Sequence, residues 1–168
     1  MRRLLLGALG LGVLALELTV AYAYQVRGTW WHFLLHQYIG WGLGLAAGAL
    51  IMVATRRRVP VIAALLLGQL VSIVPDLMFR FMRMPHTAWM DLWVGHISIH
   101  RGPSPLLVAT AVLLLGGLAW LLTSVRPAYA VVVALLGPIL LTGACLAAKP
   151  LPTRLSDFGV DTVTVVPR

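Results

Sequence analysis

The sequence predicts an all-α fold: a multi-pass transmembrane helical bundle of about five spans with one polar extramembrane segment. The 168 residues are 60% hydrophobic and only 11% charged, whereas a soluble domain averages about 25% charged residues. The apolar residues form long runs of roughly the 20 residues that are needed to cross a bilayer. The stretch from Val74 to Pro105, by contrast, holds two of the five acids, three of the five histidines and three of the thirteen basic residues.

The first expected span covers about 4–24 and follows two arginines. It carries Glu17 at membrane depth, where a carboxylate is costly unless it is paired or functional. Glu17 could therefore form a hydrogen bond to a neighbouring helix, or it could have a role near a polar site. Ala21-Tyr22-Ala23 is similar to a signal-peptidase site. Cleavage there is the alternative to a retained span.

The rest of a single transmembrane domain, 1–148, contains four further expected spans, at about 33–55, 60–75, 105–125 and 128–148. The second span includes a Gly44-xxx-Gly48 pair, which permits close helix packing. The third is expected to end at Pro75, and the polar segment 76–104 follows it. A polar tail, 149–168, ends the chain with an alternating run that could be a strand or coil.

The net charge of +8 comes from basic residues that are dispersed beside the apolar runs. No basic patch with interleaved aromatic residues is present, so nucleic acid is not expected as a partner, whereas membrane lipids are. The single cysteine, Cys145, excludes an intrachain disulfide and lies in an apolar run, where a buried, inert thiol is expected. Oligomeric state is not predicted.

The distribution of arginines suggests an orientation. With five spans, the Arg2–Arg3 pair and the Arg56–Arg58 triplet share one side and lie tightly against their spans. Because positive residues next to spans favour the cytoplasm, we expect a plasma (inner) membrane protein with a cytoplasmic N-terminus. The polar segment would then face outward.

All five histidines are predicted on that outer side, together with two of the five acids; these residues are His32, His36, His86, His96, His100, Asp76 and Asp91. Histidines four residues apart share one side of a helix, as His32 and His36 would, and likewise His96 and His100. Imidazole and carboxylate groups drawn from three elements are suitable ligands for a divalent metal such as Zn²⁺.

Other readings of the cluster are weaker. Each histidine alone could be an interfacial hydrogen-bonding group, and Asp76 could pair with Arg80, four residues along a helix. A b-type haem held by His36 with His96 or His100 would need histidines facing each other in mid-membrane. A serine hydrolase would need a GxSxG elbow, which the sequence lacks.

Three short motifs add a resemblance: His36-Gln37-Tyr38-Ile39-Gly40, Pro75-Asp76 and His100-Arg101-Gly102. In this order they resemble the small membrane-bound metal-dependent hydrolases of the LexA-regulated, YdjM-like type, over about residues 33–122. The resemblance implies that His36, Asp76 and His100 bind the metal. The chain departs from the family pattern at Leu77, where a second Asp is usual. It departs again at Ser104-Pro105, where Thr-His-Ser is usual.

The predicted function is metal-dependent hydrolysis of an ester or phosphoester, with a lipid as one candidate substrate, at the outer membrane face. Asp91 and His96 are candidates for the general base or additional ligands. Arg101, or Arg80, would hold a negative charge of the substrate. The alternative is a non-catalytic membrane protein whose His/Asp cluster is structural, or binds metal within a larger assembly.

Overall fold

The computed structural model describes residues 2–26, 29–85 and 87–148. Within these ranges all regular structure is helical: α1 (Arg2–Val26), α2 (Trp30–Thr55), α3 (Val61–Met82), the 3₁₀ helices η1 (Ala88–Leu92) and η2 (Ser98–Arg101), α4 (Pro105–Leu122) and α5 (Pro127–Leu146). The predicted all-α fold is confirmed. His86 and the tail with its alternating run lie outside the described residues.

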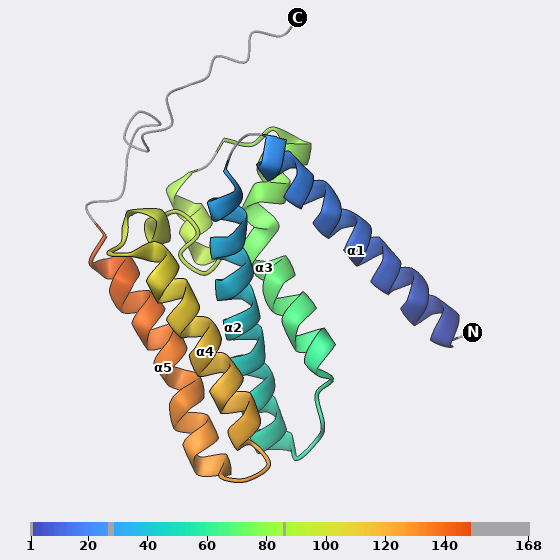
Figure 1. The fold of residues 1–168 in the computed structure, drawn as a ribbon, viewed down its shortest axis with the longest axis vertical. Helices are drawn as coiled ribbons and strands as arrows, with labels where there is room; N and C mark the ends of the chain where they lie inside the picture. Colours follow the sequence, from blue (N-terminus) through green and yellow to red (C-terminus); the bar gives the residue numbers. More distant parts are fainter. Residues whose placement is uncertain (1, 27–28, 86, 149–168) are drawn as a thin grey trace, which may run out of the picture.

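Helix α2 lies at the centre of the bundle, where it packs against α3, α4 and α5. Successive helices run in opposite directions (Figure 1). As a result, the ends of α1, α3 and α5 and the starts of α2 and α4 gather at one end of the bundle (Figure 1). Helix α1 leans away from the others along most of its length (Figure 1).

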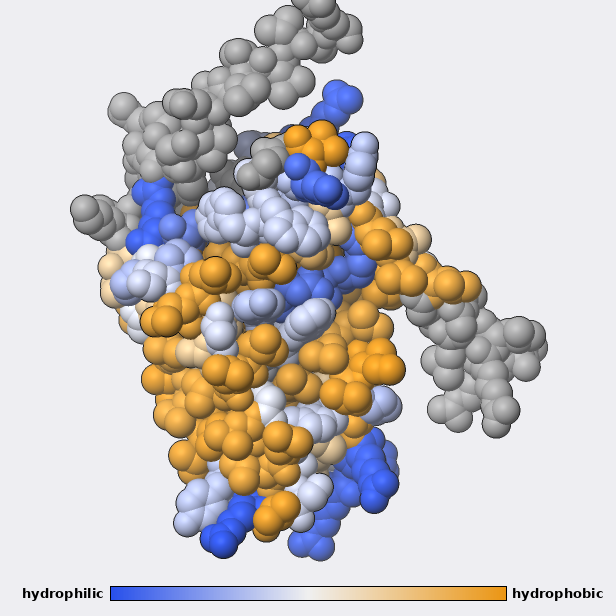
Figure 2. Space-filling view, in the orientation of Figure 1, coloured by the Kyte–Doolittle hydropathy of each residue, from blue (hydrophilic) through white to orange (hydrophobic). Residues whose placement is uncertain are grey.

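Four helices, α2 to α5, are long and apolar enough to cross a membrane, and Leu11–Val26 of α1 forms a shorter apolar helix. Large apolar side chains point outward from the bundle, such as Leu121 at 71% exposure and Ile139 at 64%. Figure 2 shows a band of hydrophobic residues between hydrophilic ends. This surface suits a lipid environment, and the chain is a multi-pass helical bundle.

The expected end of the third span at Pro75 is wrong, because α3 continues to Met82. Proline removes one hydrogen-bond donor and crowds the preceding turn, but helices of membrane proteins tolerate it when neighbouring groups satisfy the freed backbone. Asp76 therefore lies inside a helix rather than in a loop. Similarly, α2 begins at Trp30, so His32 is already helical.

Glycines set the short distances between α2 and its neighbours. A side chain added to Gly68 of α3 would meet the backbone of Gly40 and Gly44, and one added to Gly116 of α4 would meet the backbone of Gly42. The predicted close packing of the glycine-rich second span is thus confirmed. It holds α3 and α4 directly against the helix that carries His32 and His36.

A buried amide, that of Gln69 in α3, joins three helices. Its oxygen accepts hydrogen bonds from Gln37 Nε2 and from Trp41 Nε1, both at 2.9 Å. Its nitrogen donates to Gln37 Oε1 and to a carboxylate oxygen of Glu17 in α1. Of the two readings of Glu17, the hydrogen bond to a neighbouring helix is therefore confirmed.

Candidate metal centre

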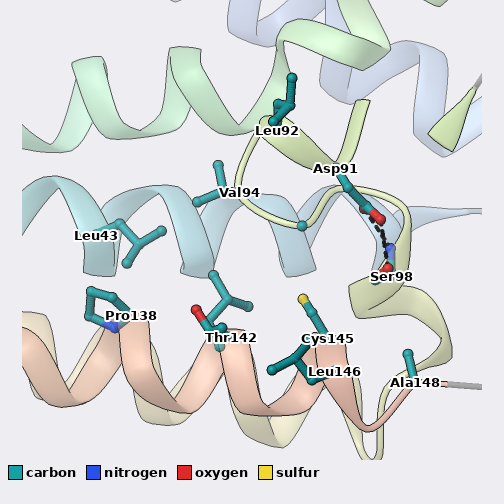
Figure 3. Close-up of a pocket in the computed structure, with 12 residues that line it drawn as sticks. Leu43, Asp91, Leu92, Val94, Ser98, Pro138, Thr142, Cys145, Leu146 and Ala148 are labelled. Atoms are coloured by element: carbon teal, nitrogen blue, oxygen red, sulfur yellow. Dashed lines mark hydrogen bonds between the residues drawn. The ribbon is translucent and has the colours of Figure 1, made fainter. Parts of the chain in front are cut away.

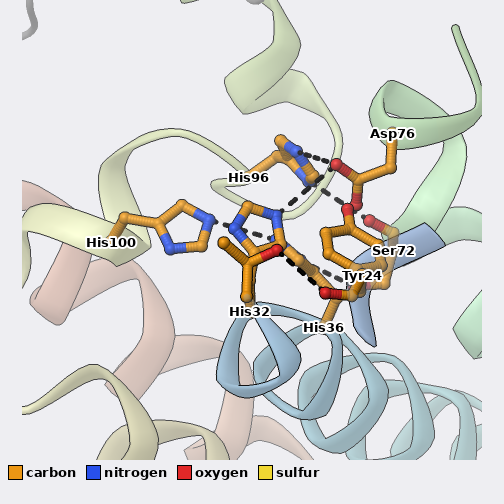
Figure 4. A network of polar contacts seen from close by, with 8 residues as sticks. Tyr24, His32, His36, Ser72, Asp76, His96 and His100 are labelled. Carbon is orange, nitrogen blue, oxygen red and sulfur yellow. Dashed lines mark hydrogen bonds and ion pairs between the residues drawn. The ribbon is translucent and has the colours of Figure 1, made fainter. Parts of the chain in front are cut away.

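Three separate elements bring four possible ligands together at one end of the bundle (Figure 4). Helix α2 supplies His32 and His36, which lie one turn apart, α3 supplies Asp76, and the loop between η1 and η2 supplies His96. The ligand atoms of these four residues all lie within 4.8 Å of one another. His36, Asp76 and His96 are buried and His32 is partly buried.

The carboxylate of Asp76 faces two of the imidazoles. Its Oδ1 lies 3.4 Å from Nε2 of His96 and 3.5 Å from Nε2 of His32. The rings of His36 and His96 stack with their centroids 4.1 Å apart. Since these rings touch directly, they leave no space for a porphyrin between them, which argues against the haem reading.

His100, from η2, adjoins this group. Its Nε2 lies 3.1 Å from Nε2 of His36, and its ring stacks on His32 at 4.2 Å between centroids. Trp31 packs edge-on against the ring of His100, and Tyr24 of α1 stacks on His32. The four described histidines therefore form one continuous cluster with Asp76.

The hydrogen-bond partner of His96 fixes where its ring carries a proton. Nδ1 of His96 lies 3.3 Å from the backbone carbonyl oxygen of Ser72. A carbonyl oxygen can only accept, so Nδ1 carries the hydrogen. In the neutral ring, Nε2 then directs a lone pair at the carboxylate of Asp76. Two acceptors at this distance require a positive charge between them, either a proton or a metal ion.

The spacing of the donors fits a metal ion. Two ligand atoms, each 2.0–2.2 Å from a tetrahedral ion, lie roughly 3.3–3.6 Å apart. The His96–Asp76 pair has this spacing, at 3.4 Å between Nε2 and Oδ1, and so does the His32–Asp76 pair, at 3.5 Å between Nε2 and Oδ1. An N–H donated to a backbone carbonyl is also typical of metal-binding histidines. Imidazole with carboxylate suits zinc and other first-row divalent ions.

Asp91 lies outside the ligand group, which consists of the four candidate ligands His32, His36, Asp76 and His96. Its Oδ1 accepts from the backbone N–H groups of Ile97 and Ser98, at 2.7 and 2.8 Å. Its Oδ2 accepts from the Ser98 hydroxyl at 2.6 Å, and Figure 3 shows Asp91 and Ser98 facing each other. Gly95, with φ +69°, turns the chain just before His96. The carboxylate of Asp91 thus ties the two ends of the loop that presents His96.

The two arginines flank the centre differently. Arg101 is half-buried and follows His100 in η2, whereas Arg80 is exposed on α3, one turn after Asp76. The expected i, i+4 helical relation of His96 and His100 is wrong, since His96 precedes the 3₁₀ helix that contains His100. Their ring centroids are nonetheless 6.1 Å apart, since a turn closed by the N–H of Ile99 on the carbonyl of Gly95 lies between them.

Two residues of the centre were not singled out as site residues in the sequence. His32 belongs to the ligand group, and its spacing from His36 was the available signal. Ser72 contacts two of the histidines, and it precedes Asp76 by one helical turn. The one-turn spacing of Ser72 from Asp76 is informative only because α3 extends past Pro75.

The fold and the cluster define a class: a multi-pass helical membrane protein with a buried His/Asp group that could hold a metal ion. No protein-family model, curated protein or solved structure matches the chain.

Proposed function

We propose that the chain is a membrane-embedded, metal-dependent hydrolase that cleaves an ester or phosphoester at the membrane surface. The observation that carries this proposal is the convergence of His32, His36, Asp76 and His96 to within 4.8 Å. The resemblance to YdjM-like hydrolases supports the same reading. The orientation suggested by the arginines puts this centre on the outer face of a plasma (inner) membrane.

The four residues of the ligand group would hold the divalent ion, with zinc as the leading candidate. Such an ion, when bound, lowers the pKa of a water to about 7 and polarises a carbonyl or phosphoryl oxygen. His100, beside His36 and less buried than it, is assigned the proton transfer. The adjacent Arg101 would bind a negatively charged oxygen of the substrate.

A cavity of about 570 Å³ next to the His96 loop favours a lipid as the substrate (Figure 3). At one end it is lined by apolar residues from the middle of α2 and α5, including Leu43 and Pro138. At the other end it is lined by Asp91 and Ser98. The half-buried Cys145 also lines this cavity. An acyl chain would fit the apolar part while the ester lies near the loop, and the volume is typical of ligand sites.

The test uses the full-length protein, purified in detergent, with wild type, His36→Ala and a control, Thr110→Ala. The Thr110 hydroxyl bonds only within α4, to the carbonyl of Leu106 at 2.8 Å. Metal content is measured by mass spectrometry, and turnover is measured on fluorogenic esters of short and long acyl chains and on a phosphodiester. We expect stoichiometric metal and turnover in wild type and control, and neither in His36→Ala.

The outcomes separate the two hypotheses. Stoichiometric metal without turnover on any of these substrates would favour a metal-binding component of a larger assembly. Absence of metal from a folded wild-type protein, together with a lowered melting temperature of His36→Ala, would favour a purely structural cluster. A preference for long-chain over short-chain esters would support the lipid assignment.

A further inference from the structure

Ser72 contacts two of the candidate ligands at once, although they come from different elements. Its hydroxyl oxygen lies 3.4 Å from Nδ1 of His36 in α2, and its backbone carbonyl oxygen lies 3.3 Å from Nδ1 of His96 in the loop. Ser72 is only 1% exposed, so water does not compete for these contacts. In both rings the nitrogen that contacts Ser72 is Nδ1, so the other ring nitrogen, Nε2, is the atom that would bind the ion.

The position of Ser72 in α3 explains how its carbonyl can serve a neighbouring loop. Pro75 follows three residues later and has no N–H, so it cannot donate a hydrogen bond to the carbonyl of Val71. The ring of a proline inside a helix also crowds the turn before it and bends the helix there. The carbonyl that loses its helical donor is thus that of Val71. The carbonyl of Ser72, one residue later, can accept from His96 in addition to the helix because a carbonyl oxygen has two lone pairs.

We propose that Ser72 is a positioning residue for the metal centre: its carbonyl holds the hydrogen of His96 on Nδ1, its hydroxyl accepts a hydrogen bond from Nδ1 of His36, and both Nε2 atoms are thereby directed at the ion. This inference rests on the proposed metal centre. Metal ligands must be deprotonated at the binding atom, and partners of the opposite ring nitrogen fix the tautomer and orientation of metal-binding histidines.

The side chain and the backbone of Ser72 make separable contributions. Ser72→Ala removes the hydroxyl that faces His36 and retains the carbonyl that faces His96. Ser72→Thr retains both groups and serves as the conservative variant. Thr110→Ala is the matched control, because it also deletes one hydroxyl from a helix but lies away from the centre.

The experiment titrates the metal-free, full-length protein in detergent with Co²⁺ and records the visible absorption bands, which report ligand geometry. We expect Ser72→Ala to bind Co²⁺ at least about 10-fold more weakly than wild type, since partners of metal ligands typically contribute 10–100-fold. Its absorption bands should change in shape. Ser72→Thr should recover most of the affinity and the wild-type spectrum, and Thr110→Ala should match wild type.

A second measurement needs no Ser72 variant and covers the case in which Ser72→Ala does not fold. In Zn²⁺-loaded wild-type protein with ¹⁵N-labelled histidine, NMR should show the hydrogens of His36 and His96 on Nδ1. Binding of either residue through Nδ1 would overturn the positioning role, as would wild-type Co²⁺ affinity and spectrum in Ser72→Ala. If the wild type binds neither ion, the proposed metal centre itself fails.

Discussion

Nε2 of His96 and Oδ1 of Asp76 face each other at 3.4 Å, although one residue belongs to a loop and the other to α3. Because the Ser72 carbonyl holds the hydrogen of His96 on Nδ1, this contact joins two acceptors unless a positive charge lies between them. The pair therefore needs a positive charge between its two atoms, which a proton on His96 or a metal ion could supply.

Asp76→Asn should weaken Zn²⁺ binding by at least about 100-fold, more than the loss typical of groups that only orient ligands. The substitution keeps the shape of the side chain and removes the negative charge that the ion would neutralise. Competition with a chelator of known affinity measures the effect, with Thr110→Ala as the control. Wild-type affinity in Asp76→Asn would remove this residue from the ligand set.

His100→Gln separates proton transfer from metal binding. If His100 transfers a proton, the variant should keep its metal and lose turnover by roughly 10²–10⁴-fold, the usual contribution of a general acid or base. Metal content and turnover should be measured on the same preparation. Loss of the metal would instead make His100 a ligand, which is the role that the YdjM-like resemblance implies.

Asp91→Asn should loosen the loop that carries His96. The carboxylate accepts two backbone N–H bonds and one hydroxyl bond, and hydrogen bonds to charged groups contribute about 1.5–3 kcal/mol each. Hydrogen exchange of residues 93–98 should accelerate, with weaker metal binding as a consequence. Ser98→Ala, which removes one of the three bonds, should have a smaller effect; equal exchange in Asp91→Asn and wild type would contradict this.

Gly68→Ala should destabilise the bundle by about 1–3 kcal/mol, the usual cost of overpacking. The added methyl group would meet the backbone of Gly40, which cannot move without separating α3 from α2. Gly117→Ala is the matched control, because a side chain there would have no atom within 4 Å. Thermal unfolding of metal-free protein in detergent should show a lower melting temperature for Gly68→Ala alone.

The sequence predicted the helices well because the bilayer imposes long apolar runs that are visible without any knowledge of packing. It also predicted that His36, Asp76 and His100 would meet at one end, because alternating helix directions determine which termini share a face. His36 and Asp76 belong to the ligand group, and His100 lies against His36.

The local chemistry of the centre was harder to predict. The third span was expected to end at Pro75, but α3 continues past this proline to Met82. The loop has no repeating pattern, so nothing in the sequence indicated that Asp91 would bond to Ile97 and Ser98 rather than face the histidines. Such contacts depend on tertiary packing.

The amide of Gln69 has consequences for the first helix. Its oxygen and nitrogen are both engaged, with Gln37 and Trp41 on one side and Glu17 on the other. Inside a bilayer no water can replace a lost partner. A change at Gln69 would therefore remove a partner of the Glu17 carboxylate. It would also remove one of the contacts that hold this outlying helix to the bundle, beside the packing of Tyr24 on His32 and Phe33.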